Sequence, residues 1–206
     1  MEQPSLFGEN DDGTFVPFTD ILFNALLGFA FMIFIAFSLI NPEAKLGTVE
    51  LKAEMIITVS WPDSNPDDID TYVEEPGGNI VWYHSREAGL VHLDRDDRGN
   101  YRDTLNINGT EITNPLNQET VTIRQFIPGE YVVNVVHYLA NSGNPVPVTV
   151  KVERINPKVE VVYYGTVELN RRGQEETVVR FTISPTGEVS DINAIQKSLV
   201  GSLNKA

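Results

Sequence analysis

The feature that most constrains this chain is Ile21–Ile40, a run of twenty residues without a charged side chain. A helix of twenty residues is about 30 Å long, which matches the hydrocarbon core of a bilayer. Only Asn24 and Ser38 in the run are clearly polar. Pro17 before the run and Asn41-Pro42 after it are typical of a helix start and stop. The run therefore predicts one transmembrane helix.

A signal peptide and a soluble core helix both fit the run less well than a membrane anchor. A cleavable signal peptide has a basic segment before a short apolar core, whereas the first twenty residues contain no Lys or Arg and the run is long. Helices of a small soluble domain generally have a polar face, whereas a helix that is apolar all round, like this run, is typical of a membrane span or of the core of a large protein. We therefore expect a retained membrane anchor. The positive-inside rule, taken alone, weakly favours a cytoplasmic C-terminal part, because Lys45 and Lys52 follow the run and no basic residue precedes it.

The amino-acid composition argues against several classes of partner and chemistry. Fifteen Lys and Arg against 29 Asp and Glu give a net charge of −14, which argues against nucleic acid as a partner and against a polybasic membrane anchor. Without cysteine the chain has no disulfide, no thiolate nucleophile and no Cys-ligated zinc. A hydrophobic content of 41% excludes bulk disorder.

Asp20 lies directly before the apolar run and is the candidate functional residue of this segment. Phe15, Val16 and Phe18 extend the hydrophobic stretch beyond it, so apolar sequence encloses the acid. Asn24 follows four residues later, on the same face of a helix. Because an ionisable group at membrane depth is costly and marks a functional site, the pair predicts a polar stripe that binds a proton or a cation. The alternative is an acid at the headgroups that complements the helix dipole.

The stretch Val16-Pro17-Phe18-Thr19-Asp20-Ile21-Leu22 leads into a single aliphatic and aromatic span. It resembles the start of the ExbD, TolR and MotB type of energy-transducing subunit. Pro17 and Asp20 match the Pro-x-x-Asp-aliphatic signature of that family in spacing, and the resemblance covers residues 15 to 45. It implies that Asp20 carries the translocated ion, H⁺ or Na⁺. It also implies a single-pass protein of a bacterial inner membrane, with a cytoplasmic N-terminus and a periplasmic C-terminal domain.

The resemblance further implies partners and a mechanism. A homodimer of this chain would lie within a ring, expected to be a pentamer, of multi-span MotA, TolQ or ExbB-like subunits. Asp20 would be charged when open to water and neutral inside the ring, because protonation removes the desolvation cost that blocks movement. Ion flow would then drive mechanical work on an extracytoplasmic partner, without covalent catalysis and with no cofactor required besides the coupling ion.

Beyond Thr48 the sequence predicts an antiparallel β-sandwich, Ig-like or jelly-roll-like, because short β-branched runs alternate with turn signals such as Pro76-Gly77-Gly78-Asn79. The predicted strands are Val49–Trp61, Asp70–Val73, Ile80–Tyr83, Glu119–Ile123, Tyr131–Leu139, Val146–Val152, Val159–Leu169 and Glu176–Ile183. Tyr131 is expected to pack inward. The predicted organisation is a cytoplasmic tail (1–18), a transmembrane helix (19–41), a connector (42–48), the extracytoplasmic sandwich (49–190) and a C-terminal tail or short helix (191–206).

Two acidic pairs in the predicted sandwich suggest a Ca²⁺ site. Asp68 and Asp70 form a D-x-D pair, and Asp94 and Asp96 follow in a second segment. Carboxylates on converging loops are the ligands that Ca²⁺ prefers, and the pattern is similar to bacterial extracellular sandwich domains with a D-x-D…P-x-G strand and an acidic loop. The alternative is a solvated acidic rim in which the carboxylates pair with neighbouring arginines, Arg86, Arg95, Arg98 and Arg102.

Catalytic motifs are absent from the sequence. His84, His92 and His137 are not in an H-E-x-x-H arrangement, and the chain has no G-x-S-x-G elbow and no P-loop. The sequence also lacks the peptidoglycan-binding pattern that MotB relatives carry, so the sandwich is expected to bind another protein or a glycan, or to dimerise with its twin. Two alternative functions stay open: a passive membrane-anchored binding module and a tethered Ca²⁺-dependent adhesin.

Overall fold

The computed structural model describes residues 15–40, 52–99 and 103–204, and the remaining residues lie outside the description. The chain divides into two compact units, Met1–Glu50 and Leu51–Ala206, which are treated separately. The predicted tail before Phe15 and the predicted connector (42–48) both fall outside the described residues.

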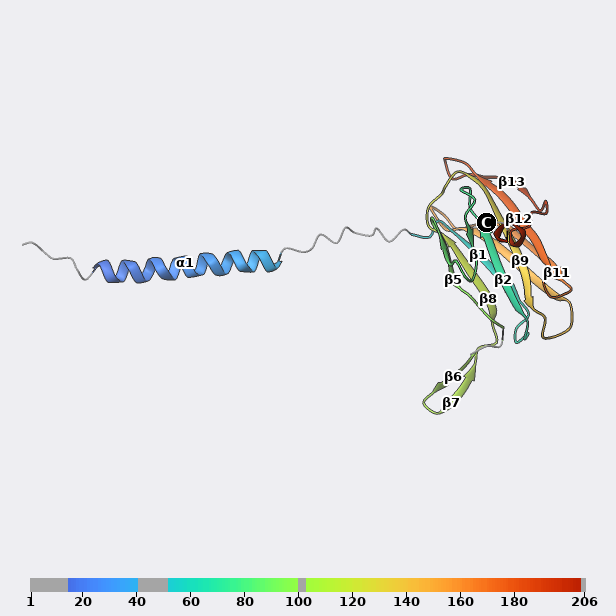
Figure 1. Cartoon of the computed structure of the whole chain (residues 1–206), viewed down its shortest axis with the longest axis horizontal. Coiled ribbons are helices and arrows are strands. Elements are labelled where there is room, and N and C mark those ends of the chain that lie inside the picture. The colour runs from blue at the N-terminus through green and yellow to red at the C-terminus, as the bar shows by residue number, and fades with distance from the viewer. Residues whose placement is uncertain (1–14, 41–51, 100–102, 205–206) are drawn as a thin grey trace, which may run out of the picture. The chain divides into compact units, whose positions relative to one another are not determined.

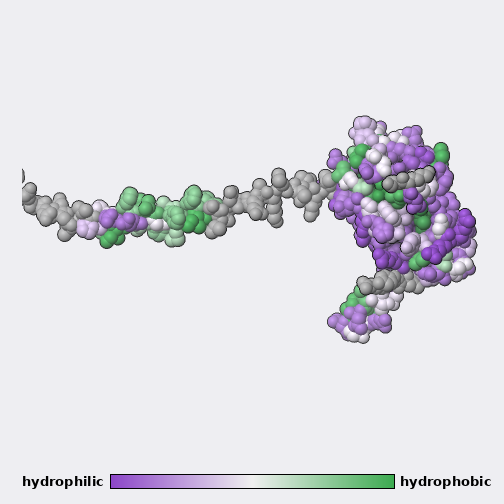
Figure 2. Space-filling view, in the orientation of Figure 1, coloured by the Kyte–Doolittle hydropathy of each residue, from purple (hydrophilic) through white to green (hydrophobic). Residues whose placement is uncertain are grey.

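The described part of the first unit is one helix, α1, at Phe15–Ile40 (Figure 1). It begins at Phe15, four residues before the predicted start at residue 19, because Phe15, Val16 and Pro17 are compatible with a first helical turn. Its segment Pro17–Phe37 is long and apolar enough to cross a membrane, a criterion that a signal sequence near an N-terminus also meets. Figure 2 shows hydrophobic side chains along most of α1 and a mostly hydrophilic visible face on the second unit.

The second unit, which we call the β domain, consists mainly of two antiparallel sheets (Figure 1). The first sheet has the order β11 (Glu160–Leu169), β10 (Val146–Arg154), β1 (Met55–Trp61), β8 (Asn117–Ile123), β5 (Val91–Arg95) and β4 (Glu87–Ala88). The second has the order β13 (Val189–Asn193), β12 (Glu175–Ile183), β9 (Gly129–Leu139), β2 (Asp68–Glu74) and β3 (Ile80–Val81). A separate hairpin joins β6 (Thr104–Ile107) to β7 (Thr110–Thr113), and a single turn of helix, α2, covers Val200–Leu203.

Both sheets contribute to one hydrophobic core. Ile57 on β1 and Ile69 on β2 are fully buried in it. Along β1, buried and partly buried residues alternate, as expected of a strand with one face on the core. Tyr131 packs inward as predicted, fully buried, with its ring stacked on Phe181 at a centroid distance of 5.5 Å. The prediction of a mainly antiparallel β fold with one N-terminal apolar helix is confirmed.

Each of the eight predicted strand segments overlaps an observed strand, but β4, β5, β13 and the β6–β7 hairpin were not predicted. The segment predicted to be a C-terminal tail or short helix (191–206) includes part of a strand and packs against the second sheet. β13 includes Val189–Asn193 and pairs with β12, so the second sheet extends past residue 190. Leu199 is fully buried with Val132 and Val136 on the outer face of that sheet, because these side chains would otherwise leave apolar surface exposed to water.

Candidate functional site

In α1 the structure places Asp20 and Asn24 one turn apart on the same face, and both are exposed on the helix surface. The first turn of α1 contains no acid. Asp20 therefore lies in the second turn, beyond the positions where a carboxylate caps the helix N-terminus. It is the one charged residue within Pro17–Phe37.

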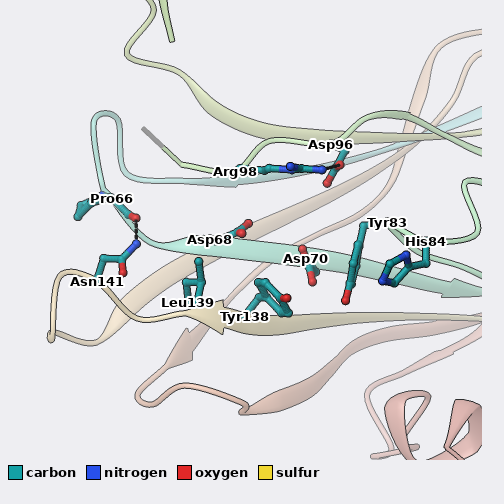
Figure 3. Close-up of a pocket in the computed structure, with 10 residues that line it drawn as sticks. All are labelled: Pro66, Asp68, Asp70, Tyr83, His84, Asp96, Arg98, Tyr138, Leu139 and Asn141. Atoms are coloured by element: carbon teal, nitrogen blue, oxygen red, sulfur yellow. Dashed lines mark hydrogen bonds and ion pairs between the residues drawn. The ribbon is translucent and has the colours of Figure 1, made fainter. Parts of the chain in front are cut away.

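The β domain contains a pocket of about 620 Å³, which we call the acidic pocket. Its lining residues are Pro66, Asp68, Asp70, Tyr83, His84, Asp96, Arg98, Tyr138, Leu139 and Asn141 (Figure 3). In Figure 3, Asp96 and Arg98 approach β2 from one side, while Tyr138 and Leu139 lie on the strand at its other side. The pocket thus combines carboxylates with aromatic rings.

Strand β2 lies at the centre of the acidic pocket, and its two edges are paired with neighbouring strands to different extents. One edge pairs with β9 along its whole length, from Asp68 to Glu74. The other pairs with β3 only at Val73 and Glu74, counting described residues. Asp68 and Asp70 face the same side by strand alternation, next to the part of the edge that β3 leaves uncovered.

Glu119 reaches this edge from β8, which belongs to the opposite sheet. Its side chain is 1% exposed, and its Oε2 accepts a hydrogen bond from the backbone N–H of Thr71 at 2.7 Å. Glu119 therefore satisfies a β2 donor at a position where β3 does not pair. Asp70, Asp96 and Glu119 each direct one carboxylate oxygen into the same small volume, and these oxygens lie within 4.8 Å of one another.

Burial and mutual repulsion raise the pKa values of these carboxyl groups. Burial, reinforced by the charges of Asp68 and Asp96, raises the pKa of Asp70 to about 8. Burial and then the charge of Asp96 raise the pKa of Asp68 to about 6. Burial raises the pKa of Glu119 well above its usual range, although the hydrogen bond from Thr71 opposes the shift. The cluster therefore resists carrying its full negative charge without a counter-charge.

Asp96 lies in the loop after β5, and contacts of the neighbouring residues Asp97 and Gly99 hold this loop beside the acidic pocket. Asp97 is buried, and its Oδ2 accepts hydrogen bonds from Arg95 Nη2 at 2.8 Å and from the backbone N–H of Gln118 at 3.2 Å. Gly99 has a φ of +62°, and a Cβ there would lie 2.7 Å from the carbonyl oxygen of Asp67. The close approach of this loop to β2 therefore requires glycine.

The segment before β2 is anchored by Asp67, which is buried beside the acidic pocket. Asp67 accepts hydrogen bonds from the backbone N–H and the Oγ of Ser142, at 2.5 and 2.7 Å, and contacts His137 Nε2 at 3.0 Å. The carboxylate lies between the serine and the histidine. A catalytic triad instead requires a serine hydrogen-bonded to a histidine, so this cluster has the geometry of a structural anchor.

Aromatic side chains form one wall of the acidic pocket. The rings of Tyr83 and Tyr138 are 5.5 Å apart, and those of Tyr83 and His84 are 4.3 Å apart. Tyr138 is 41% exposed and comes from β9, on the side of β2 away from Asp96. Such a wall suits stacking against a flat or cationic ligand group.

Of the four predicted Ca²⁺ ligands, the structure brings Asp68, Asp70 and Asp96 to the acidic pocket. Asp94 lies elsewhere: it is exposed and pairs with Arg124 at 3.4 Å, because the side chain points away from the core-facing Leu93. Glu119 was missed as a site residue. The sequence does contain an indication that Glu119 is buried, because alternation along a strand places it on the same face as Val121 and Ile123, which are buried in the core.

The expected arginine pairing is present in part. Arg95 pairs with Asp97, and Arg98 lies 3.9 Å from Asp96, while Arg102 is outside the described residues. No protein-family model matches the chain, and no curated protein matches it. The resemblance of residues 15 to 45 to ExbD, TolR and MotB therefore stays a prediction.

Proposed function

We propose that this protein is a B-type subunit of an ion-driven motor of the bacterial inner membrane, related to ExbD, TolR and MotB. One observation carries the proposal: Asp20 is a lone carboxylate inside an apolar helix, past its first turn and one turn before Asn24. A purely passive anchor has no need of such a group, since a charge at membrane depth is costly.

In the proposed mechanism Asp20 is the ion carrier. Two copies of α1 lie inside a ring of multi-span MotA, TolQ or ExbB-like subunits, and Asp20 meets water or the apolar ring interior in turn. Binding of H⁺ or Na⁺ neutralises the carboxylate and removes the desolvation cost of the interior position. Each elementary charge that crosses a potential of 100 mV supplies about 2.3 kcal/mol for movement of the ring against the dimer.

The β domain is proposed to lie in the periplasm and to receive the mechanical work, as an Ig-like or jelly-roll-like sandwich. The Tyr131 hydroxyl donates a hydrogen bond to the carbonyl oxygen of Ile127 at 3.1 Å and accepts one from its N–H at 3.2 Å. A tyrosine that bonds to backbone a few residues upstream resembles the tyrosine corner of Ig-like domains, which supports the Ig-like alternative. The target of the domain is proposed to be a periplasmic protein or a glycan.

A second candidate function is a membrane-anchored binding module, with Asp20 at the headgroups. The acidic pocket favours this candidate, because carboxylates beside exposed aromatic rings form a binding surface that requires no motor. In that case α1 serves only to hold the β domain at a membrane.

Purification of the intact complex distinguishes the two functions. The tagged full-length chain is extracted from native bacterial membranes in mild detergent, and its mass and composition are measured by native mass spectrometry. The motor proposal predicts two copies of this chain with a ring, expected to be five copies, of one multi-span protein. Recovery of the chain without any multi-span partner, both with and without prior crosslinking, would contradict it.

A further inference from the structure

We propose that the acidic pocket is a Ca²⁺ site in which Asp70, Asp96 and Glu119 bind the ion directly. Asp68 lies beside them in the pocket and adds a fourth negative charge. The site is independent of Asp20 and of the motor proposal. Its three direct ligands come from β2, from the loop after β5 and from β8, so the ion would join both sheets and one loop.

The spacing of the three carboxylate oxygens fits a single Ca²⁺ ion. They lie within 4.8 Å of one another. Ca²⁺ binds oxygen at 2.3–2.6 Å, so two oxygens on opposite sides of the ion are separated by about 4.6–5.2 Å. The three oxygens can therefore belong to one coordination shell, with water or ligand oxygens from the pocket side in the remaining positions.

A second observation, independent of the clustering of acids, also indicates a ligand. Glu119 is 1% exposed, and its Oε1 has no hydrogen-bond partner within the described part of the chain, although its Oε2 is bonded to Thr71. Asp68 Oδ1 and Asp70 Oδ2 are likewise buried and without a partner there. Buried polar atoms are almost always paired, and a cation among these oxygens would supply the interaction that each of them lacks.

The carboxyl groups of the cluster outnumber the nearby positive charges, so a divalent cation would be attracted to it. Among the described residues, four carboxyl groups face a single nearby guanidinium, that of Arg98, whose Nη2 is 3.9 Å from Asp96. A divalent cation among these carboxylates would offset their mutual repulsion.

The ligand chemistry selects Ca²⁺ among the common ions. The three direct ligands are all carboxylates, whereas zinc sites in proteins favour histidine and cysteine, and this chain has no cysteine. Mg²⁺ retains several waters and is seldom held by a dedicated cage of protein ligands. Ca²⁺ accepts irregular sets of buried carboxylates. We expect a Kd of about 10⁻⁴–10⁻³ M, which is typical of extracellular Ca²⁺ modules.

The test is a titration of the full-length protein in detergent micelles after chelator treatment and removal of the chelator. Isothermal calorimetry with CaCl₂ should show one site per chain, and Ca²⁺ should raise the Tm of the β domain while equal MgCl₂ has a smaller effect. Tb³⁺, excited through nearby tyrosines such as Tyr83, should luminesce and be displaced by Ca²⁺. No heat, no Tm shift and no displaceable Tb³⁺ signal at millimolar concentration would overturn the proposal.

Charge-removing variants locate the site. Asp96→Asn and Glu119→Gln should each weaken Ca²⁺ binding by about tenfold or more, which corresponds to about 1.4 kcal/mol. Glu119→Gln retains an oxygen that can accept the hydrogen bond from Thr71. Asp94→Asn is the matched control, because Asp94 lies outside the acidic pocket, and it should bind Ca²⁺ as the parent chain does.

A folding control and two more variants keep this test decisive. Near-UV circular dichroism in chelator shows whether each variant is folded, and Asp70→Asn serves as a third ligand variant if one of the first two is not. Equal loss of Ca²⁺ binding in Asp94→Asn and Asp96→Asn would refute this site and indicate nonspecific binding to an acidic surface. Asp20→Asn should leave Ca²⁺ binding unchanged, so failure of the motor proposal and failure of the Ca²⁺ site are distinguishable.

Discussion

Glu119 places a carboxylate on the face of β8 that otherwise contributes to the core. A buried carboxylate without partners is strongly destabilising, and the hydrogen bond from Thr71 offsets only part of that cost. The other oxygen, Oε1, has no hydrogen-bond partner within the described part of the chain, and one oxygen of Glu119 lies within 4.8 Å of oxygens of Asp70 and Asp96. At the scale of single residues, the acidic pocket is therefore a place where folding stability and ion binding are linked.

This linkage predicts how stability depends on pH without divalent ions. The charged and titratable groups around Asp70 are Asp68 and Tyr72 on β2, Tyr83 and His84 after β3, Asp96 and Arg98 after β5, Glu119 on β8 and Tyr138 on β9. Asp70 has a folded-state pKa of about 8 against 3.8 for an ordinary aspartate. Between these values the unfolded chain releases a proton that the folded chain retains, so the free energy of unfolding falls as pH rises.

We therefore expect the Tm in EDTA to decrease from pH 5 to pH 8, in steps measured by circular dichroism. Asp70→Asn should reduce the slope, because it removes the aspartate whose pKa is raised the most. Asp94→Asn should retain the parent slope. An Asp70→Asn variant with the same slope as the parent would show that the acidic pocket does not determine this pH dependence.

At the scale of elements, the acidic pocket depends on how closely the loop after β5 approaches the start of β2. Gly99 is buried in this contact, and a Cβ would meet the Asp67 carbonyl oxygen at 2.7 Å and the Pro66 backbone at 3.1 Å. Backbone atoms of an anchored segment cannot move away as a flexible side chain does. The loop carries Asp96, so its position also sets the spacing of the acidic cluster.

Gly99→Ala and Gly89→Ala form a matched pair that tests this contact. Their φ angles are +62° and +59°, but a Cβ at Gly89 meets nothing within 4 Å. Gly89→Ala should cost about 1–2 kcal/mol from left-handed backbone strain alone. Gly99→Ala should cost about 1 kcal/mol or more beyond that, because of the clash. Urea denaturation at fixed pH measures both, and equal costs would show that the close approach is not required.

At the scale of the whole molecule, the sequence predicts the strands that carry β-branched residues in alternation, such as β1 and β10. It does not predict β5, because Val91–Arg95 is short and ends in charged residues. The β6–β7 hairpin was missed although Asn108-Gly109, with φ angles of 54° and 83°, is a typical hairpin turn. Its strands are exposed throughout, so hydrophobic alternation gives no signal for it.

The candidate site was only partly predictable for a related reason. Asp68 and Asp70 stand out as a local D-x-D pair, and Asp96 follows in a second acidic segment. Glu119 joins them from a distant strand in the other sheet, through a contact that depends on how the sheets face each other. The resemblance that suggests the motor, by contrast, concerns α1 and can be tested without knowledge of the β domain.

The most direct test of the motor proposal is ion flux through the purified complex in liposomes under an imposed potential of about 100 mV. Proton and sodium entry are measured separately with ion-sensitive dyes, for the parent chain, for Asp20→Asn and for Asp12→Asn, a matched change outside Pro17–Phe37. We expect flux of one of the two ions with the parent and Asp12→Asn, and none with Asp20→Asn. Flux with Asp20→Asn equal to that of the parent, or no flux of either ion with the parent, would contradict the proposal.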